Sequence, residues 1–166
     1  MEYKIRHAVQ QDKSVIMDIY AYARRFMAEH GNPNQWKKNN PSEETIDNDI
    51  LSGQLYVIYE SGNEVAVHGV FYFHIGEDAT YAVIEDGQWL SDEIYGTIHR
   101  IASDGTIHGV LSLAVEFCEK QIKHLRIDTH KDNAIMQYVI EKNGFSKCGT
   151  IYVKDGSPRI AYEKVL

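Results

Sequence analysis

Residues 95–123 read YGTIHRIASDGTIHGVLSLAVEFCEKQIK. The segment 95–103 predicts a central strand, the glycine-containing segment 104–109 a turn, and the segment 110–123 a helix whose apolar residues recur at helical spacing. A strand end, a glycine turn and a helix N-terminus in this order aim free backbone N–H groups and the positive end of the helix dipole at one point. The stretch therefore predicts a strand-to-helix crossover with a candidate anion site, although many such glycine turns bind nothing.

Predicted strands and helices, recognised by the spacing of their apolar residues, flank this crossover. Before it, the pattern predicts a strand at 3–9, a helix at 12–29, a helix that Ser42 caps, strands at 55–59 and 65–75, and a less regular piece at 80–90. After it, the pattern predicts a strand at 125–129, a helix at 133–142, and strands at 145–153 and 160–165. These elements indicate an α+β fold with a mixed, mostly antiparallel central sheet and flanking helices, in a single domain over residues 1–166.

Composition excludes several classes of partner. The 166 residues are 43% hydrophobic and 25% charged, which is enough for a packed core without a disulfide or a metal. Lys and Arg number 17 against 24 Asp and Glu, a net charge of −7 with no basic tract, so we expect no nucleic-acid partner. There is no apolar signal segment and no run near the ~18 residues of a membrane span, so we expect a cytoplasmic protein with no membrane partner. Cys118 and Cys148 stand apart and predict free thiols rather than a metal site.

Three segments carry a resemblance to a known family: IHRIAS at 98–103, IDTHKDN at 127–133 and EKNGF at 141–145. With Asn133 about ten residues before the Gly144-Phe145 pair, and in this order, they resemble the GNAT N-acetyltransferase superfamily over essentially the whole chain. Small bacterial acetyltransferases of uncharacterised substrate are the most similar members. The resemblance implies the GNAT fold and transfer of an acetyl group from acetyl-CoA to an amine by direct attack, without a metal.

The resemblance also implies where acetyl-CoA binds. In such enzymes the central strand pairs with the pantetheine arm, and the next loop and helix N-terminus hold the pyrophosphate. A splay between the central strand and the 125–129 strand leaves room for the thioester, in agreement with the usual ligand position in open sheets. The residues carried over are Ile101 and Ser103 for pantetheine, Thr106, His108, Gly109, Val110 and Leu111 for the pyrophosphate, and Asn133 near the thioester.

Two positions depart from the family pattern. Of the phosphate-loop motif only Gly109 remains, and Leu111 stands where a small residue normally lets phosphate approach the helix. Ile140 occupies the position where many members have the tyrosine that protonates the leaving thiolate. Tyr138 is close in sequence but lies about 200° around the helix, at roughly 100° per residue. The usual general acid is therefore missing.

Several side chains are candidates for the base and for the acceptor pocket. Asp128 and His130 end a strand beside the expected thioester and are candidates for the general base. Glu85 is a further candidate, either as a base or as a partner of a cationic acceptor. For Asp128, a structural role as a capping residue is an equal alternative to a catalytic one. His99 has the weakest claim, because strand alternation can bury it. Candidate walls of the acceptor pocket are Trp36, Trp89 and Tyr95, and the polar loop around Trp36 indicates a lid.

The sequence predicts acetyl transfer to a primary amine and leaves the acceptor open among an amino acid, a polyamine, an aminoglycoside-like compound and a protein N-terminus. Ile140 and the altered phosphate loop favour the main alternative, a non-catalytic module that binds acyl-CoA. A structural protein that retains only the fold is a second alternative. Exposed edge strands leave a homodimer open.

Overall fold

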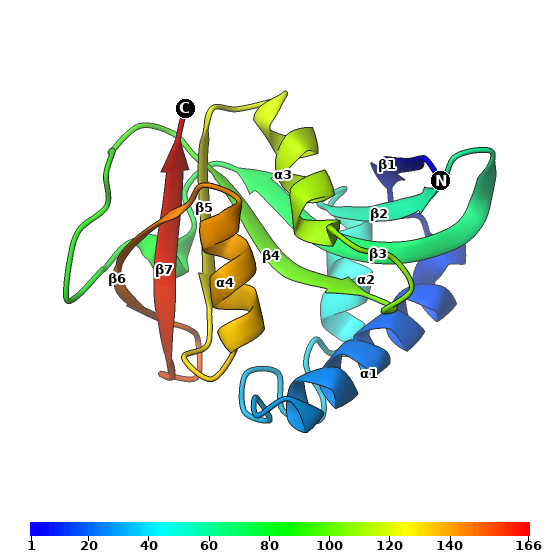
Figure 1. The fold of residues 1–166 in the computed structure, drawn as a ribbon, viewed down its shortest axis with the longest axis horizontal. Helices are drawn as coiled ribbons and strands as arrows, with labels where there is room; N and C mark the ends of the chain where they lie inside the picture. Colours follow the sequence, from blue (N-terminus) through cyan, green and yellow to red (C-terminus); the bar gives the residue numbers. More distant parts are fainter.

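A computed structural model describes all 166 residues. Its seven strands form one sheet in the order β1-β2-β3-β4-β5-β7-β6, with helices on both faces (Figure 1). The strands are β1 (Tyr3–His7), β2 (Leu55–Glu60), β3 (Asn63–Ile75), β4 (Gly96–Ser103), β5 (His124–Thr129), β6 (Ser146–Tyr152) and β7 (Pro158–Val165). The α-helices are α1 (Lys13–Glu29), α2 (Glu43–Leu51), α3 (Val110–Glu119) and α4 (Ala134–Lys142), with short 3-10 turns at Gln10–Asp12 and Ala79–Tyr81. The predicted α+β class and mixed sheet are confirmed.

The sheet consists of two halves that meet at a narrow seam. Strands β4 and β5 are the one parallel pair, and they are paired only at Gly96 with Leu125 and at Thr97 with Arg126. Beyond Thr97 the two strands part, which confirms the predicted splay. Gly96 permits the close approach at the seam, because a Cβ there would lie 2.5 Å from the Phe73 ring and 3.1 Å from Leu125.

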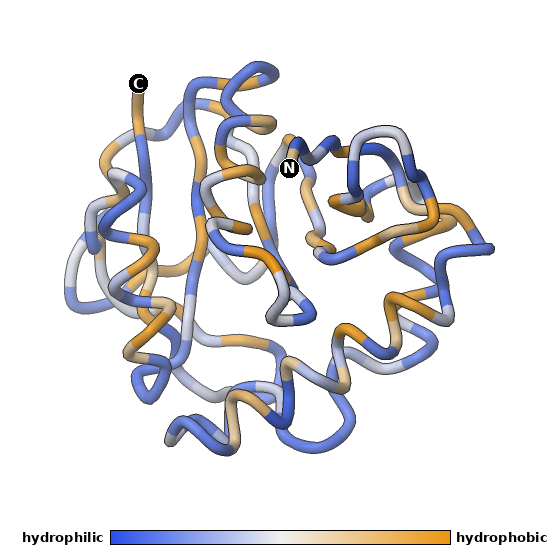
Figure 2. Tube along the Cα trace, turned by 45° about the vertical axis from the view of Figure 1, so that its right-hand side comes forward, coloured by the Kyte–Doolittle hydropathy of each residue, from blue (hydrophilic) through white to orange (hydrophobic).

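Alternation along the strands sends successive side chains to opposite faces, and each face has its own core. Helices α3 and α4 cover one face and bury a cluster of sixteen residues that includes Ile98, Leu111 and Ile140. Helix α1 and α2 cover β2 to β4 on the other face through Ile16 and Ile46, among others. Apolar and polar positions alternate along α1 in Figure 2, as expected for a helix with one face on a sheet. The two cores fix the position of β4 from both sides.

Local signals place most element ends correctly. Ser42 caps α2 as predicted, since its Oγ accepts a hydrogen bond of 3.1 Å from the backbone N–H of Thr45. Helix α3 ends at Glu119, before the predicted end at 123, and Ile122 instead turns back against the first core and the seam. None of the helices is both long enough and apolar enough to cross a bilayer.

Candidate active site

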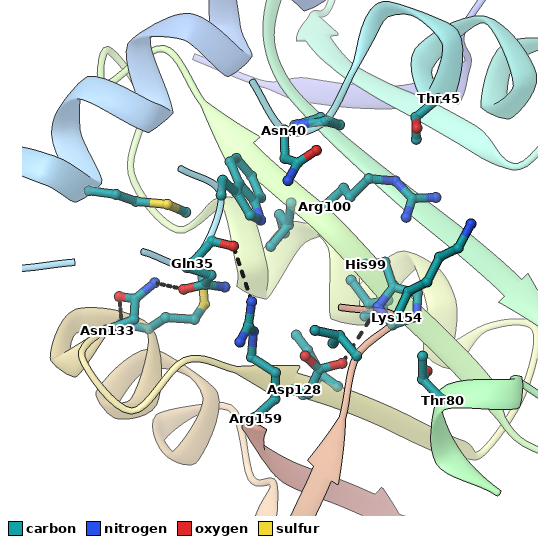
Figure 3. Close-up of a pocket in the computed structure, with 18 of the residues that line it drawn as sticks. Gln35, Asn40, Thr45, Thr80, His99, Arg100, Asp128, Asn133, Lys154 and Arg159 are labelled. Atoms are coloured by element: carbon teal, nitrogen blue, oxygen red, sulfur yellow. Dashed lines mark hydrogen bonds and ion pairs between the residues drawn. The ribbon is translucent and has the colours of Figure 1, made fainter. Parts of the chain in front are cut away.

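A cleft of about 630 Å³ opens where β4 and β5 part (Figure 3). Its walls come from β4, β5, the first turn of α4, the loop between α1 and α2, and the loop between β6 and β7. Polar or charged side chains that line it are Gln35, Asn40, Thr45, Thr80, His99, Arg100, Asp128, Asn133, Lys154, Asp155 and Arg159. Trp36 lines the cleft from the loop between α1 and α2 and packs edge-on against Tyr20 at 5.6 Å. This loop therefore covers the cleft, in the position predicted for a lid.

His99 lies between two carboxylates on the floor of the cleft. Its Nε2 is 2.9 Å from Asp78 Oδ2, and its Nδ1 is 3.6 Å from Asp128 Oδ2. His99 and Asp128 are each two residues beyond the last paired residues of β4 and β5, so they face each other across the parting strands. Nε2 thus lies against Asp78, and Nδ1 faces Asp128. An imidazole and a carboxylate are held together in the cleft.

Further hydrogen bonds hold the two carboxylates in place. Asp128 Oδ2 accepts a hydrogen bond of 2.6 Å from Tyr81 Oη, and Asp78 Oδ1 accepts from the backbone N–H and the hydroxyl of Thr80. Burial would raise the pKa of Asp78, but the hydrogen bonds from His99 and Thr80 hold it well below its ordinary value. Burial and the neighbouring Asp128 carboxylate raise the pKa of Tyr81 well above its ordinary value, so its phenol remains a donor.

A bulge in β4 lies beside His99. On β3, Tyr72 pairs with His99 and Val70 with Ala102, so Arg100 and Ile101 together oppose Phe71. Arg100 has a φ of 50°, in the left-handed region that costs a non-glycine residue of order 1–3 kcal/mol. A bidentate pair with Asp49 at 2.8 and 2.9 Å holds this conformation, together with a stack of the guanidinium on Tyr72. Bulges are common beside active sites, where they re-aim the chain.

The loop before α3 is open but carries an acidic group. Gly109 has a φ of 73°, and a Cβ added there would meet nothing within 4 Å, so space lies in front of the helix N-terminus. Leu111 is buried and belongs to the core, so its side chain does not fill that space as the sequence suggested. Asp104 Oδ1 already accepts from the backbone N–H of Thr106 at 2.9 Å. An anion at this loop would therefore rely on the backbone donors of α3.

His68 contacts Asp104 of this loop, and we expect it to make the stability of the fold depend on pH. His68 bridges two carboxylates, with Nδ1 2.7 Å from Asp104 and Nε2 2.8 Å from Glu60. Burial lowers the pKa of His68, but the two carboxylates outweigh it and raise that pKa above 6.5. Protonated His68 thus stabilises the fold, fully below a pH of about 6.5, and this contribution is lost as pH rises through the raised pKa.

We expect the Tm difference between wild type and His68→Asn to shrink from about pH 5.5 to about pH 9 in thermal melts. The exposed His30→Asn serves as control, and a Tm difference for His68→Asn that does not change with pH would contradict the expectation.

The structure brings some of the predicted site residues together. Trp36, Ile101, Asp128 and Asn133 line the cleft. Asn133 caps α4 through a hydrogen bond from the Met136 N–H, and its Nδ2 donates to Gln35 Oε1 at 3.0 Å. The remaining cofactor candidates lie along the loop and the start of α3, with Thr106, His108 and Gly109 exposed, Ser103 and Val110 half-buried, and Leu111 buried.

Other predicted residues lie outside this cleft. Glu85 is exposed and pairs with Thr150 of β6, and its carboxylate accepts from Tyr152 Oη at 3.0 Å. His130 is buried, and its Nδ1 accepts from the Asp132 N–H. Burial and then the positive charge of Arg159 lower the pKa of His130. Trp89 and Tyr95 line a second cavity of about 780 Å³, where both rings lie 3.9 Å from the Arg126 guanidinium. Neither Glu85 nor His130 lines the cleft that holds Asp128.

Neither the usual acid position nor the cysteines place a reactive group in the cleft. Ile140 is fully enclosed in the first core, and Tyr138 points to solvent with 65% of its surface exposed. Both cysteines are free and buried. Burial raises the pKa of Cys118 well above its ordinary value, and burial with the neighbouring Glu163 raises the pKa of Cys148 to about 11. Neither thiol is a ready nucleophile.

The mixed sheet opens between its two parallel strands, and a polar cleft lies at the opening. This is the architecture of the acyl-CoA N-acyltransferase fold. Scans of family models and of curated proteins gave no match. A GNAT-family acetyltransferase from Streptococcus agalactiae 2603 superposes with a TM-score of 0.87 over 99% of this chain and 95% of that one, at 29% identity. This similarity over the whole chain supports membership of the GNAT N-acetyltransferase superfamily.

Two more distant structures share the fold. A GNAT-family acetyltransferase from Listeria monocytogenes 4b F2365 gives a TM-score of 0.72 at 21% identity, covering 100% of this chain and 96% of that one. A ribosomal-protein-S5-alanine acetyltransferase from Vibrio fischeri gives a TM-score of 0.64 at 14% identity, covering 99% of this chain and 93% of that one. The fold therefore extends across superfamily members of very different sequence.

Proposed function

We propose that this protein transfers the acetyl group of acetyl-CoA to a primary amine by direct attack. The observation that carries the proposal is His99, held by Asp78 with its Nδ1 toward Asp128 where β4 and β5 part. An amine nucleophile must lose a proton and be held in line with the thioester carbonyl. The position of His99 beside Asp128 supports the first requirement, and the open cleft between β4 and β5 gives room for the second.

Each residue has a distinct part in this proposal. The carboxylate of Asp128, fixed by Tyr81, holds the incoming ammonium, and Nδ1 of His99 takes its proton. Asp78 orients the imidazole and stabilises the charge that develops on it. The amine nitrogen then bonds to the acetyl carbon as the carbon–sulfur bond breaks. Protonated His99 holds the proton that the departing thiolate needs, so the missing tyrosine at Ile140 does not prevent turnover.

Direct attack fits the cleft better than an acyl-enzyme. A covalent route needs an activated nucleophile beside a base. Cys118 and Cys148 are buried with raised pKa values, and neither lines the cleft. The polar side chains around His99 instead surround an open space that can admit an acceptor.

The first test of the proposal is calorimetric titration with acetyl-CoA and with CoA. We expect wild type to bind both, and Gly109→Trp to bind at least about tenfold more weakly, because the indole occupies the open space before α3. Gly53→Trp is a matched control: Gly53 has a φ of 71° and the same open surroundings, outside the cleft, so it introduces similar backbone strain elsewhere. If wild type shows neither heat nor a thermal shift with either ligand, the proposal fails.

A further inference from the structure

Arg159, at the start of β7, is a buried cation that lines the cleft (Figure 3). Only 7% of its surface is exposed. Its Nη1 donates to Ser157 Oγ at 3.1 Å and to the Pro158 carbonyl at 2.9 Å, and its Nη2 donates to the Gln35 carbonyl at 3.1 Å. All three acceptors are neutral. The guanidinium is therefore fixed in position without a negatively charged partner bonded to it.

The donors that remain on Arg159 form a usable pair. A guanidinium carries five N–H groups, and the three hydrogen bonds leave Nε–H and one N–H of Nη2 without a protein acceptor. The Nε–H and Nη2–H donors of a guanidinium together match the two oxygens of a carboxylate. Arg100 shows the same arrangement filled: its Nε and Nη2 both donate to the carboxylate of Asp49. On Arg159 no carboxylate accepts from Nε or Nη2.

The charge of Arg159 is also unmatched, in contrast to the buried Arg126 and the half-buried Arg100. Arg126 pairs with Glu163 and Arg100 with Asp49, whereas no carboxylate lies within 4.0 Å of Arg159. Asp128 and Asp155 act on it only through space. Buried charges in proteins are normally paired, since an isolated one carries a large desolvation cost. Lys154, elsewhere on the cleft wall, also forms no ion pair. The unpaired guanidinium of Arg159 therefore favours an anionic group.

We infer that the acceptor is an amino acid whose carboxylate binds the free Nε–Nη2 edge of Arg159 while its amine lies between His99 and Asp128. The inference rests on the proposed acetyl transfer and narrows its acceptor class. Purely cationic amines, such as polyamines and aminoglycoside-like compounds, would place positive charge against Arg159 and Lys154. A carboxylate instead meets the unpaired guanidinium of Arg159 and leaves its amine for His99 and Asp128.

The test compares each common L-amino acid with its own amide, which keeps the amine and the side chain but lacks the carboxylate. With saturating acetyl-CoA, thiol release gives kcat/KM for both members of each pair. We expect the best amino acid to exceed its amide by about 10- to 100-fold, the range for hydrogen bonds to a charged group. The amide has the more easily deprotonated amine, so intrinsic reactivity works against this result. In Arg159→Gln the ratio should fall to near one, with the amide rate little changed.

Two variants separate recognition from a structural role. Arg159→Lys keeps the charge without the paired donors and should give an intermediate ratio, and the exposed Arg25→Gln should retain the wild-type ratio. A lid displaced by loss of the Gln35 contact would lower both rates and leave their ratio unchanged. A wild-type ratio near one, or a ratio that Arg159→Gln does not alter, would overturn the inference.

Failure of the proposed function is a separate outcome. If acetyl-CoA binds but no amine of either series is acetylated, the proposed transfer fails. The same pairs are then compared by thermal shift of the CoA-bound protein. Stabilisation by amino acids but not by their amides, lost in Arg159→Gln, would still support the carboxylate site. Equal shifts for acid and amide would overturn it.

Discussion

His99→Gln is expected to lower kcat by about 10²- to 10⁴-fold, the usual contribution of a positioned general base. Glutamine is of similar size and can keep a hydrogen bond to Asp78, but it has no basic nitrogen at the position of Nδ1, 3.6 Å from Asp128. Binding of acetyl-CoA should remain within about threefold of wild type, because the phosphate loop lies on another part of the fold. Stopped or continuous thiol-release assays with the best acceptor measure kcat, and calorimetry measures the acetyl-CoA affinity.

A histidine on the neighbouring strand provides the control for this prediction. His74 lies on β3, its Nδ1 is 2.9 Å from Gln54 Nε2, and it does not line the cleft. His74→Gln should therefore keep the wild-type kcat. If His99→Gln retains more than about a tenth of the wild-type kcat, another group removes the proton and the assignment is wrong.

Glu163→Gln is expected to destabilise the fold by about 3–5 kcal/mol, which lowers the Tm by about 10 °C or more in a protein of this size. Glu163 is fully buried on β7, where its carboxylate binds His124, Arg126 at 3.2 Å and the backbone N–H of Leu90 at 2.6 Å. Removing its charge leaves the buried Arg126 without a carboxylate partner. Thermal and urea unfolding followed by circular dichroism measure the change.

An exposed glutamate provides the comparison. Glu93 lies in the segment before β4, and its carboxylate makes no ion pair. Glu93→Gln should change the free energy of unfolding by less than about 0.5 kcal/mol, as is usual at the surface. A Glu163→Gln protein that melts within about 2 °C of wild type would show that the Trp89 and Tyr95 rings and the Ser91 carbonyl suffice to hold Arg126.

The sequence predicted the fold well because its signals are local. The period of the apolar residues marks strands and helices, Ser42 marks the start of α2, and the glycine turn marks the crossover into α3. The splay between β4 and β5 followed from the family resemblance rather than from periodicity. In each case the deciding residues lie within a few positions of one another.

The site was predicted less well because its contacts are long-range. His99 had the weakest claim on alternation alone, and its partners Asp78 and Asp128 come from two separate segments 21 and 29 positions away. Nothing near Arg159 in sequence marks it as a cleft residue, since Gln35 meets it across 124 positions. Glu85 was expected near the acceptor, but its segment pairs with β6 through Thr150. Strand alternation gives a side chain's face, and only the tertiary fold gives its neighbours.

The two-pair seam at Gly96 has a consequence for how such an enzyme changes its acceptor during evolution. Strands β4 and β5 are paired at one end only, so a small rotation between them at this seam produces a larger displacement at the open end of the cleft. One side carries His99 and the other carries Asp128 and Arg159. Substitutions around Gly96, packed against Phe73 and Leu125, therefore change the distances from His99 to Asp128 and Arg159 together. Adaptation to a longer or shorter acceptor can therefore begin at the seam around Gly96, away from the residues that line the cleft.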